Sequence, residues 1–206
     1  MKLLVLGPTG GLGRQIIAQS VELGHHVTVL ARDPAKLSAR HEHLKCMKGN
    51  VLRASDVEAA LDGQDAVISA LGVGSSRRSF NLIEGAMPVI VNAMKRQGVR
   101  RLIFTSGISL KLAQVSLPLR LLLRLMLWDQ IRDKKAGEEI LRDSAIDWTL
   151  IYPTILTDGP RTGEYRVGEH LELSGFPKVS RADVADVILK LLTDSESVHR
   201  DLVVSS

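Results

Sequence analysis

Residues 2–13, KLLVLGPTGGLG, combine a short apolar run that ends at Gly7 with further glycines at Gly10 and Gly13. Residues 2–6 are typical of a buried β-strand. Residues 12–23 place leucine, isoleucine and valine at approximately helical spacing. The glycines therefore occupy the turn between a strand and a helix, and we expect a βαβ unit to begin here.

Strands and helices are predicted to alternate along the rest of the chain. Strands are predicted at 27–31, 44–48, 66–70, 102–105 and 148–152, and helices at 55–61 and 81–97. Gly98 is a candidate C-terminal cap for the last of these helices. The alternation predicts a Rossmann-like α/β fold, a doubly wound parallel sheet of strand order 3-2-1-4-5-6, in a single domain over 1–206.

Composition limits the partners and the compartment. The chain of 206 residues has a net charge of +4, but its basic residues are scattered among acids and aromatic residues are only 3% of the chain. We therefore expect no nucleic-acid partner. The single cysteine, Cys46, cannot form an internal disulfide, which predicts a reducing cytoplasm. No apolar run approaches the roughly 20 residues of a spanning helix, and no secretion signal is visible.

The glycine-rich turn is a candidate phosphate site. In a strand–turn–helix context, the first glycine allows the tight turn, the middle one lets backbone approach a pyrophosphate, and the last lets the helix pack closely. The helix N-terminus then presents free N–H groups to the phosphates. The candidate residues are Gly7, Thr9, Gly10, Gly11, Leu12 and Gly13.

The end of the second strand predicts which dinucleotide binds. An acidic residue there usually holds the ribose of NAD, whereas arginine accommodates the 2′-phosphate of NADP. This strand ends in Arg32, and Lys36 follows one turn later. Asp33 is a complication because it could face the ribose. The pattern favours NADP over NAD.

The remaining strands should bring other candidates to the same edge, since parallel strands present their carboxyl ends together. That predicted edge carries Gly7, Arg32, Asn50, Leu71, Gly72, Ser106 and Tyr152.

Several motifs resemble the atypical short-chain dehydrogenases/reductases of the NmrA-like NAD(P)-binding group. They are the glycine turn, VTVLARDP at 27–34, GNVL at 49–52 and DAVISALG at 65–72. The likeness extends through segments at 105–106, 138–144, 152–154, 162–163 and 180–185, and is closest to the biliverdin-IXβ reductase or flavin reductase branch. It thus covers nearly the whole chain.

The resemblance implies roles for individual residues. Thr9, Gly10 and Gly13 would hold the pyrophosphate, Arg32 and Lys36 the 2′-phosphate, Asn50 and Val51 would lie by the adenine, and Leu71 and Gly72 by the ribose. Ser106 would lie near the nicotinamide and the substrate, as the candidate catalytic residue, and Thr105, Tyr152 and Pro153 complete the expected cofactor-binding set. Two positions depart from the pattern: Asn50 replaces a common aspartate, and Ile155 an active-site histidine.

The expected chemistry is limited by a missing proton donor. The Tyr-x-x-x-Lys pair of typical alcohol dehydrogenases is absent, because neither Tyr152 nor Tyr165 has lysine at i+4 and Lys134 has Gln130 at i−4. This disfavours ketone reduction, and likewise nucleotide-sugar epimerisation. Conjugated acceptors such as flavins, quinones or tetrapyrroles demand less. We expect an NADPH-dependent reductase of such acceptors; the alternative is a non-catalytic NmrA-like module that senses NADP(H) or binds a protein.

Residues 107–130 and 153–178 are expected to form the substrate region. Within the first, the stretch 117–128 is apolar except for Arg120 and Arg124, which share one helical face. We interpret it as a helix over an apolar pocket; a dimer contact, a membrane-surface helix and ordinary packing stay open as alternatives. The expected state is a monomer or homodimer.

The histidines before the third strand lack the spacing of a metal site, so no metal is expected. Cys46 is interpreted as a small core residue of that strand. Residues 180–183 fit a helix-capping pattern.

Overall fold

The computed structural model describes residues 1–72, 81–107, 117–173 and 176–206, without the side chains of 117–127. An eight-stranded sheet forms its centre, in the order β3-β2-β1-β4-β5-β6-β10-β8. The strands are β1 (Lys2–Leu6), β2 (His26–Ala31), β3 (Leu44–Lys48), β4 (Ala66–Ser69), β5 (Arg101–Thr105), β6 (Asp147–Pro153), β8 (Arg166–Gly168) and β10 (Arg200–Ser205). The predicted Rossmann-like order 3-2-1-4-5-6 is confirmed.

The sheet is extended beyond the predicted strands at one edge. β10 pairs in parallel with β6, and β8 pairs antiparallel with β10. A separate pair, β7 (Ile155–Thr157) and β9 (Lys178–Ser180), is also parallel. The sequence analysis missed these strands because three of them are only three residues long, and β10 begins with two charged residues.

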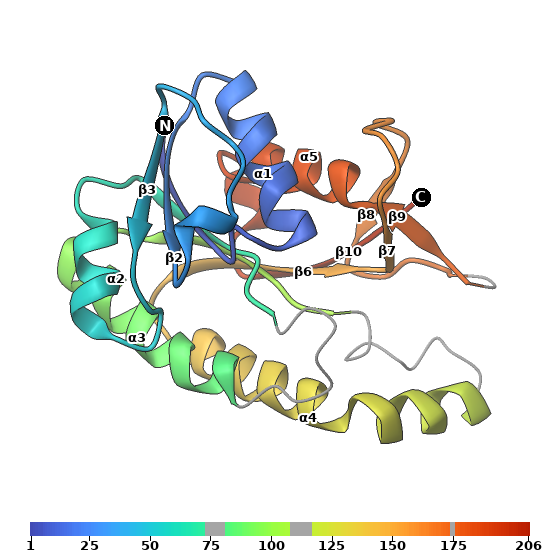
Figure 1. Ribbon diagram of the computed structural model, residues 1–206. Helices are drawn as coiled ribbons and strands as arrows, with labels where there is room; N and C mark the ends of the chain where they lie inside the picture. Colours follow the sequence, from blue (N-terminus) through green and yellow to red (C-terminus); the bar gives the residue numbers. More distant parts are fainter. Residues whose placement is uncertain (73–80, 108–116, 174–175) are drawn as a thin grey trace.

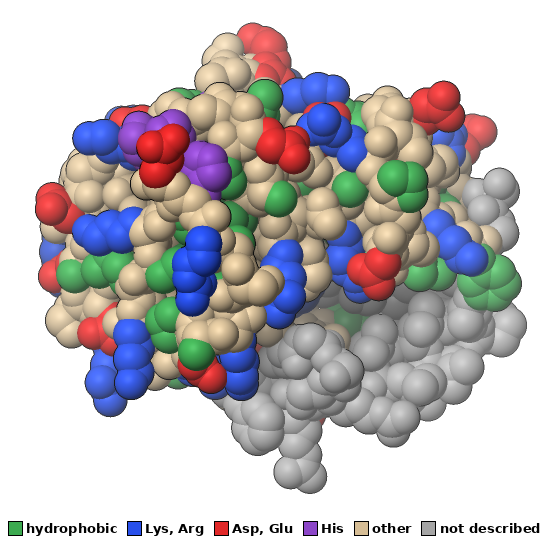
Figure 2. All heavy atoms as spheres, turned by 45° about the horizontal axis from the view of Figure 1, so that its top comes forward, with side chains coloured by type: hydrophobic (Ala, Val, Ile, Leu, Met, Phe, Trp, Pro, Cys, Tyr) green, Lys and Arg blue, Asp and Glu red, His purple; other side chains and the backbone are tan. Residues whose placement is uncertain are grey.

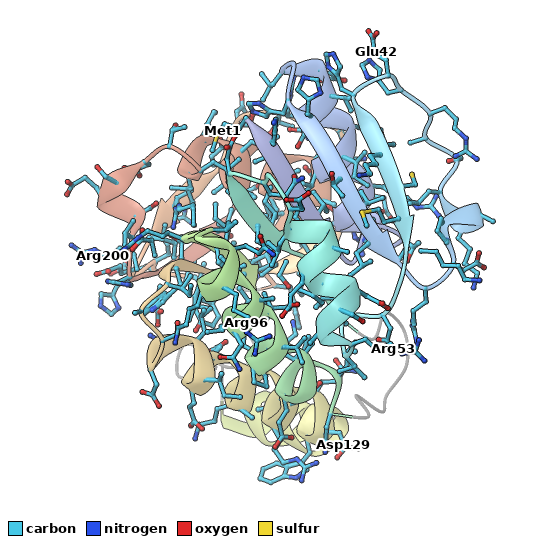
Figure 3. All side chains as sticks on the ribbon, turned by 90° about the vertical axis from the view of Figure 1, so that its left-hand side faces the viewer. Met1, Glu42, Arg53, Arg96, Asp129 and Arg200 are labelled. Atoms are coloured by element: carbon cyan, nitrogen blue, oxygen red, sulfur yellow. The ribbon has the colours of Figure 1, made fainter. Side chains whose placement is uncertain are left out.

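Helices cover both faces of the sheet (Figure 1). α1 (Gly11–Glu22) and α5 (Arg181–Leu191) lie on one face, and α2 (Ala54–Leu61), α3 (Leu82–Gln97) and α4 (Leu117–Arg142) on the other. Alternate residues of β1 feed two cores: Leu3 and Val5 pack toward α1 and α5, and Leu4 and Leu6 toward α2 and α3. In Figure 3, where Arg53, Arg96 and Asp129 mark α2, α3 and α4, the three helices lie side by side.

The N-terminus of α3 is capped by a different helix. Its own N-cap residue, Asn81, makes no side-chain cap, and the Asp133 carboxylate of α4 accepts hydrogen bonds from Ile83 N at 3.0 Å and Glu84 N at 2.9 Å. Asp133 is 1% exposed. A buried carboxylate at a helix N-terminus satisfies orphan N–H groups and the helix dipole together. This contact fixes α4 against α3 beside the site described below.

Two local predictions about caps are confirmed. Gly98 closes α3 in the left-handed region at φ 70°, and Ser180 Oγ accepts from Asp183 N at the start of α5. Asp183 does more than the pattern indicated, because its buried carboxylate also accepts from Thr162 N and Gly163 N and so orders that loop.

The prediction that Cys46 is a core residue is wrong, since its side chain is exposed. The reason is that β3 is the edge strand of the sheet, and none of its residues is buried. Within the described ranges, no group of histidine, cysteine and acidic residues could hold a metal ion.

Surface charge is mixed, as expected: Figure 2 shows basic and acidic side chains interspersed over one face. In the part of the chain that the structure describes, no helix is both long and apolar enough to cross a membrane. Residues 117–128 do form helix, within α4. The predicted pocket cover at 117–128 rests on side chains, and those of residues 117–127 lie outside the described part of the chain. Residues 108–116 lie outside it entirely.

Candidate cofactor and active site

The turn between β1 and α1 is packed so tightly that two of its glycines admit no side chain. Gly7 has φ +79°, and a Cβ there would meet the backbone of Ala70 at the end of β4, 2.7 Å from its carbonyl carbon. A Cβ on Gly13 would meet Gly7 O and lie 2.9 Å from Pro8 Cα. The turn therefore makes close backbone contacts with Ala70 on one side and with the first turn of α1 on the other.

The N-terminus of α1 is left open for an anion. Gly10 N donates to Gly7 O at 3.3 Å, and the first intrahelical bond runs from Arg14 N to Gly10 O at 3.0 Å. No side chain of the described residues caps this helix, and its first turn holds no acidic residue. The N–H groups of Gly11 and Leu12 are thus available to a ligand. This arrangement fits a pyrophosphate.

Two adjoining cavities, of about 540 and about 480 Å³, lie over this turn. Both fall in the size range of ligand sites in proteins. They share Gly7, Thr9, Arg32, Leu71 and Gly72, so together they form one elongated site. The first also takes in the predicted residues Gly10, Gly11, Leu12, Gly13, Thr105 and Ser106, and the second takes in Lys36, Asn50 and Val51.

The smaller cavity is bordered by cations at the end of β2. Arg32 is exposed and borders both cavities, and Lys36 borders the smaller one. Asp33, the acid that could have faced a ribose, also borders the smaller cavity; its carboxylate accepts from Ala35 N at 3.2 Å and lies 3.8 Å from Lys36 Nζ. Two cations against one carboxylate leave this end of the cavity with a net positive charge.

Asn50 has a structural use for its side-chain oxygen. Oδ1 accepts from Leu52 N at 3.1 Å, and Asn50 N donates to Asp56 Oδ2 at 2.8 Å. The side-chain amide nitrogen remains as the donor that Asn50 can offer at the smaller cavity, which this residue borders. The asparagine therefore offers a ligand a donor where an aspartate would offer an acceptor.

Buried hydroxyl groups gather where β4 and β5 end. Ser69 Oγ, Thr105 Oγ1 and Ser106 Oγ are enclosed and have no hydrogen-bond partner among the described residues. Ser106 is 3% exposed, borders the larger cavity and is fixed by its backbone N–H, which donates to Ile151 O at 2.8 Å. Enclosed polar atoms without partners are uncommon in folded proteins, and a ligand that supplies the partner is one explanation.

A further wall of the larger cavity, which the sequence did not predict, is supplied by α4. Gln130, Asp133 and Lys134 border the larger cavity. Burial lowers the pKa of Lys134 to about 8, although the nearby carboxylates of Glu138 and Asp133 act in the other direction. Gln130 and Lys134 lie four residues apart, the spacing at which a Tyr-x-x-x-Lys pair would place its tyrosine. The same spacing places both side chains on one helical face.

Tyr152 and Pro153 differ from their predicted role, since neither borders either cavity. Side chains alternate along β6, so Ile151 packs toward α5 while Tyr152 points between the sheet and α4. Tyr152 is 1% exposed and donates through its hydroxyl to Glu138 Oε2 at 2.7 Å. The end of β6 therefore contributes the buried hydrogen bond between Tyr152 and Glu138.

Arg181, the first residue of α5, connects the C-terminal part of the chain to the glycine turn. It borders the larger cavity and pairs with Asp158, Nη1 to Oδ1 at 2.5 Å. Its side chain crosses Gly11 so closely that a Cβ there would lie 2.8 Å from Arg181 Cδ. The capping pattern at 180–183 gave no indication of this second role.

Comparison with known proteins identifies the family. The NAD(P)H-binding family matches residues 7–195. A 113-residue segment, 52% of this chain, is 33% identical to the photosystem II assembly factor Ycf39 of Synechocystis. The match covers 33% of Ycf39, so the chain spans about a third of the length of that relative.

Two solved structures share the fold over nearly the whole chain. One is a short-chain dehydrogenase/reductase from Veillonella parvula in complex with NADP, with a TM-score of 0.84, 20% identity and coverage of 100% of this chain and 94% of that one. The other is ChuY, an anaerobilin reductase from Escherichia coli O157:H7, with a TM-score of 0.83, 21% identity and coverage of 99% and 96%. The glycine turn, the sheet order and the match over 7–195 agree: the chain belongs to the NAD(P)H-binding family and has a Rossmann-like fold.

Proposed function

We propose that this protein is an NADPH-dependent reductase that transfers hydride to a conjugated acceptor of the flavin, quinone or tetrapyrrole type. The observation that carries the proposal is the continuity of the site. One elongated cavity system joins the open N-terminus of α1 to Arg32 at one end and to Ser106 and Lys134 at the other. A dinucleotide has this order of parts, with phosphates between its adenosine and nicotinamide ends.

The preference for NADPH over NADH rests on charge. Arg32 and Lys36 stand at the end of β2 where a 2′-phosphate would lie, and Asp33 sets only one carboxylate against them. A guanidinium forms strong, charge-assisted hydrogen bonds to phosphate. The same groups would gain little from the neutral 2′-hydroxyl of NADH.

Within the site, NADPH supplies the hydride, and the protein supplies binding and orientation. Gly11 and Leu12 would hold the pyrophosphate through their N–H groups. Ser106 and Lys134 would both border the reacting end. Ordering both reactants in one enclosed site accounts for a large part of catalysis in such reactions.

The acceptor class follows from the polar groups at that end. No tyrosine of the described residues borders either cavity, and Gln130 occupies the position four residues before Lys134. A simple ketone needs a strong acid at its oxygen as hydride arrives, whereas a conjugated acceptor spreads the electron pair over its own atoms. ChuY, described as an anaerobilin reductase, shares the fold, which supports including tetrapyrroles among the acceptors.

The test is oxidation of NADPH by a panel of acceptors: free flavin, a naphthoquinone, a linear tetrapyrrole and, as a control, a simple ketone. We expect turnover with at least one conjugated acceptor, faster with NADPH than with NADH, and none with the ketone. NADPH binding without oxidation by any conjugated acceptor would instead support the non-catalytic sensing function. Gly10→Val, which should fold but not bind cofactor, serves as the matched background control.

A further inference from the structure

A buried carboxyl group lies directly beneath the reacting end of the site. Glu138 stands one turn after Lys134 on α4 and is 6% exposed. Its Oε2 accepts from Tyr152, but its Oε1 has no hydrogen-bond partner among the described residues. Ser106 Oγ, at the cavity wall, is likewise without a partner within ordinary hydrogen-bond distance, and the Ser106 hydroxyl lowers the pKa of Glu138. The hydroxyl therefore lies beside the carboxyl.

Protonation of Glu138 would give both Glu138 Oε1 and Ser106 Oγ a hydrogen-bond partner. A carboxylate offers only acceptor oxygens, so in its ionised form Glu138 would take the hydrogen of Ser106 Oγ and leave that hydroxyl none to direct into the cavity. A carboxylic acid with its proton on Oε1 can donate to Ser106 Oγ while Oε2 still accepts from Tyr152. The Ser106 hydroxyl, with its oxygen already accepting, then directs its own hydrogen into the cavity. One proton orders a chain of three side chains that ends at the wall of the site.

We propose that Glu138 stores the proton that follows the hydride and passes it to the reduced acceptor through the hydroxyl of Ser106. This inference rests on the proposed reductase function and names how that reaction is completed. Ser106 is the residue that touches the acceptor, and Glu138 acts through it.

When bound, NADPH would supply the hydride with its electron pair, and the acceptor would gain a bond to hydrogen. The displaced electron pair comes to rest on a heteroatom of the acceptor, which takes the hydrogen of Ser106 Oγ. Ser106 regains a proton from Glu138, which becomes a carboxylate and is reprotonated from solvent after product leaves. The sum is one NADPH, one acceptor and one proton consumed, with NADP⁺ and the reduced acceptor formed.

The charged groups around Glu138 permit this role. Lys134 and Arg142 flank it on α4, Tyr152 faces it from β6, Asp201 from β10, and Ser106 from the end of β5. Arg142 Nη2 is 3.9 Å from Glu138 Oε2 but 2.7 Å from Asp201 Oδ2, so the arginine is paired chiefly with the aspartate.

Burial raises the pKa of Glu138, while Ser106, Tyr152 and Arg142 act against it and Asp201 adds to it. A raised pKa keeps more of the acid form at a given pH. Activity should therefore be full below the pKa of Glu138 and fall as the pH rises through it.

The first experiment measures kcat against pH, at saturating NADPH and a flavin or quinone that the wild type reduces. Glu138→Gln keeps the shape of the side chain but holds no transferable proton. We expect its kcat at the acidic end of the profile to fall about a hundredfold, as on loss of a general acid, and the alkaline limb to disappear. Glu139→Gln, a neighbouring exposed position on α4, is the matched control and should retain both.

Two further variants separate proton delivery from folding. Tyr152→Phe removes a hydrogen bond that favours the ionised form of Glu138, so the alkaline limb should move to higher pH while turnover below it stays within about tenfold. The variants Ser106→Ala and Glu138→Gln remove the same route, so the double variant should be no slower than the slower single one. Independent structural effects would add instead.

A measurement without turnover completes the test: the carboxyl carbon of Glu138 is followed by NMR during a pH titration of the folded protein. A raised pKa that rises further in Tyr152→Phe is expected, and ionisation in the ordinary glutamate range would overturn the proposal. So would an alkaline limb that survives in Glu138→Gln and disappears in Lys134→Gln, because the proton would then come from the lysine. Absence of turnover in the wild type, with the raised pKa intact, would refute the reductase function and leave the carboxylic acid established.

Discussion

Replacing Gly10 by valine should abolish cofactor binding and leave the protein folded. Gly10 is the N-cap of α1, with φ −73° and ψ 160°, angles that any L-residue adopts. A Cβ there would meet only Gly7 O, at an ordinary 3.5 Å. The protein therefore has room for the first carbon of the side chain, and the branched methyl groups must extend toward the cavity that Gly10 borders.

The magnitude follows from what the methyl groups displace. The N–H groups of Gly11 and Leu12 are the donors that a pyrophosphate would use, and hydrogen bonds to charged groups contribute about 1.5–3 kcal/mol each. Loss of two such bonds corresponds to about 3–6 kcal/mol, which raises Kd for NADPH by at least about a hundredfold. The free energy of unfolding should fall by no more than about 1 kcal/mol, since valine is less favourable than glycine at a helix N-cap but meets no backbone clash there.

Two other glycines serve as controls. Gly159→Val introduces a Cβ whose nearest contact is 3.5 Å, much as at Gly10, but Gly159 borders neither cavity. It should bind NADPH like the wild type. Gly13→Ala places a methyl group against Gly7 O and Pro8 Cα, so overpacking should destabilise the fold itself, by about 1–3 kcal/mol.

The assay is calorimetric titration with NADPH, alongside circular dichroism and thermal unfolding of each variant. Normal NADPH affinity in a folded Gly10→Val protein would show that the glycine turn holds no phosphate. Equal loss of stability in Gly10→Val and Gly13→Ala would show that the two positions do not differ as their surroundings indicate.

Three further predictions concern charged side chains. Arg32→Ala should weaken NADPH binding by roughly ten- to a hundredfold and leave NADH binding nearly unchanged, since one charge-assisted contact of about 1.5–3 kcal/mol is lost; equal calorimetric affinities of the wild type for the two cofactors would refute the NADP preference. Asp133→Ala removes the cap on α3 and should lower the free energy of unfolding by about 0.5–2 kcal/mol or more, measured by chemical denaturation against the exposed-site control Asp143→Ala. Burial lowers the pKa of Lys134 to about 8, so between there and the ordinary lysine pKa the unfolded chain binds the extra proton and the free energy of unfolding should rise with pH. That rise should be smaller in Lys134→Met. An unchanged pH dependence would mean that the Lys134 ammonium group is exposed to solvent in the folded protein.

The nucleotide-facing half of the site could be predicted from the sequence because its information is local. A strand, a glycine turn and a helix follow one another within residues 2–22, and the backbone of that segment alone creates the open helix N-terminus. Arg32 and Lys36 follow directly from the next strand. Because parallel strands place their carboxyl ends at one edge, Asn50, Leu71 and Ser106 could be assigned to the same edge without any knowledge of packing.

The other half could not be predicted, because it depends on which way side chains point and on contacts between distant elements. Tyr152 stands at the correct edge, but the alternation along β6 turns it away from the cavity and onto Glu138. Lys134 and Gln130 enter the site only because Asp133, between them on α4, caps α3 and fixes the rotation of the helix.

The orientation of Tyr152 and the entry of α4 side chains into the site have one physical origin. Without aligned homologues, a helix face acquires meaning only when its packing partner is known, and the partner of Asp133 lies 50 residues away along the chain. The same rotation that brings Lys134 to the cavity wall buries Glu138 one turn later, beneath Ser106. The sequence lacks a tyrosine placed to act as the acid. The carboxyl group of Glu138 is buried next to Ser106, and its burial favours the protonated form. The absent Tyr-x-x-x-Lys motif therefore argues against one route for the proton, and the packing of α4 supplies the chain with another.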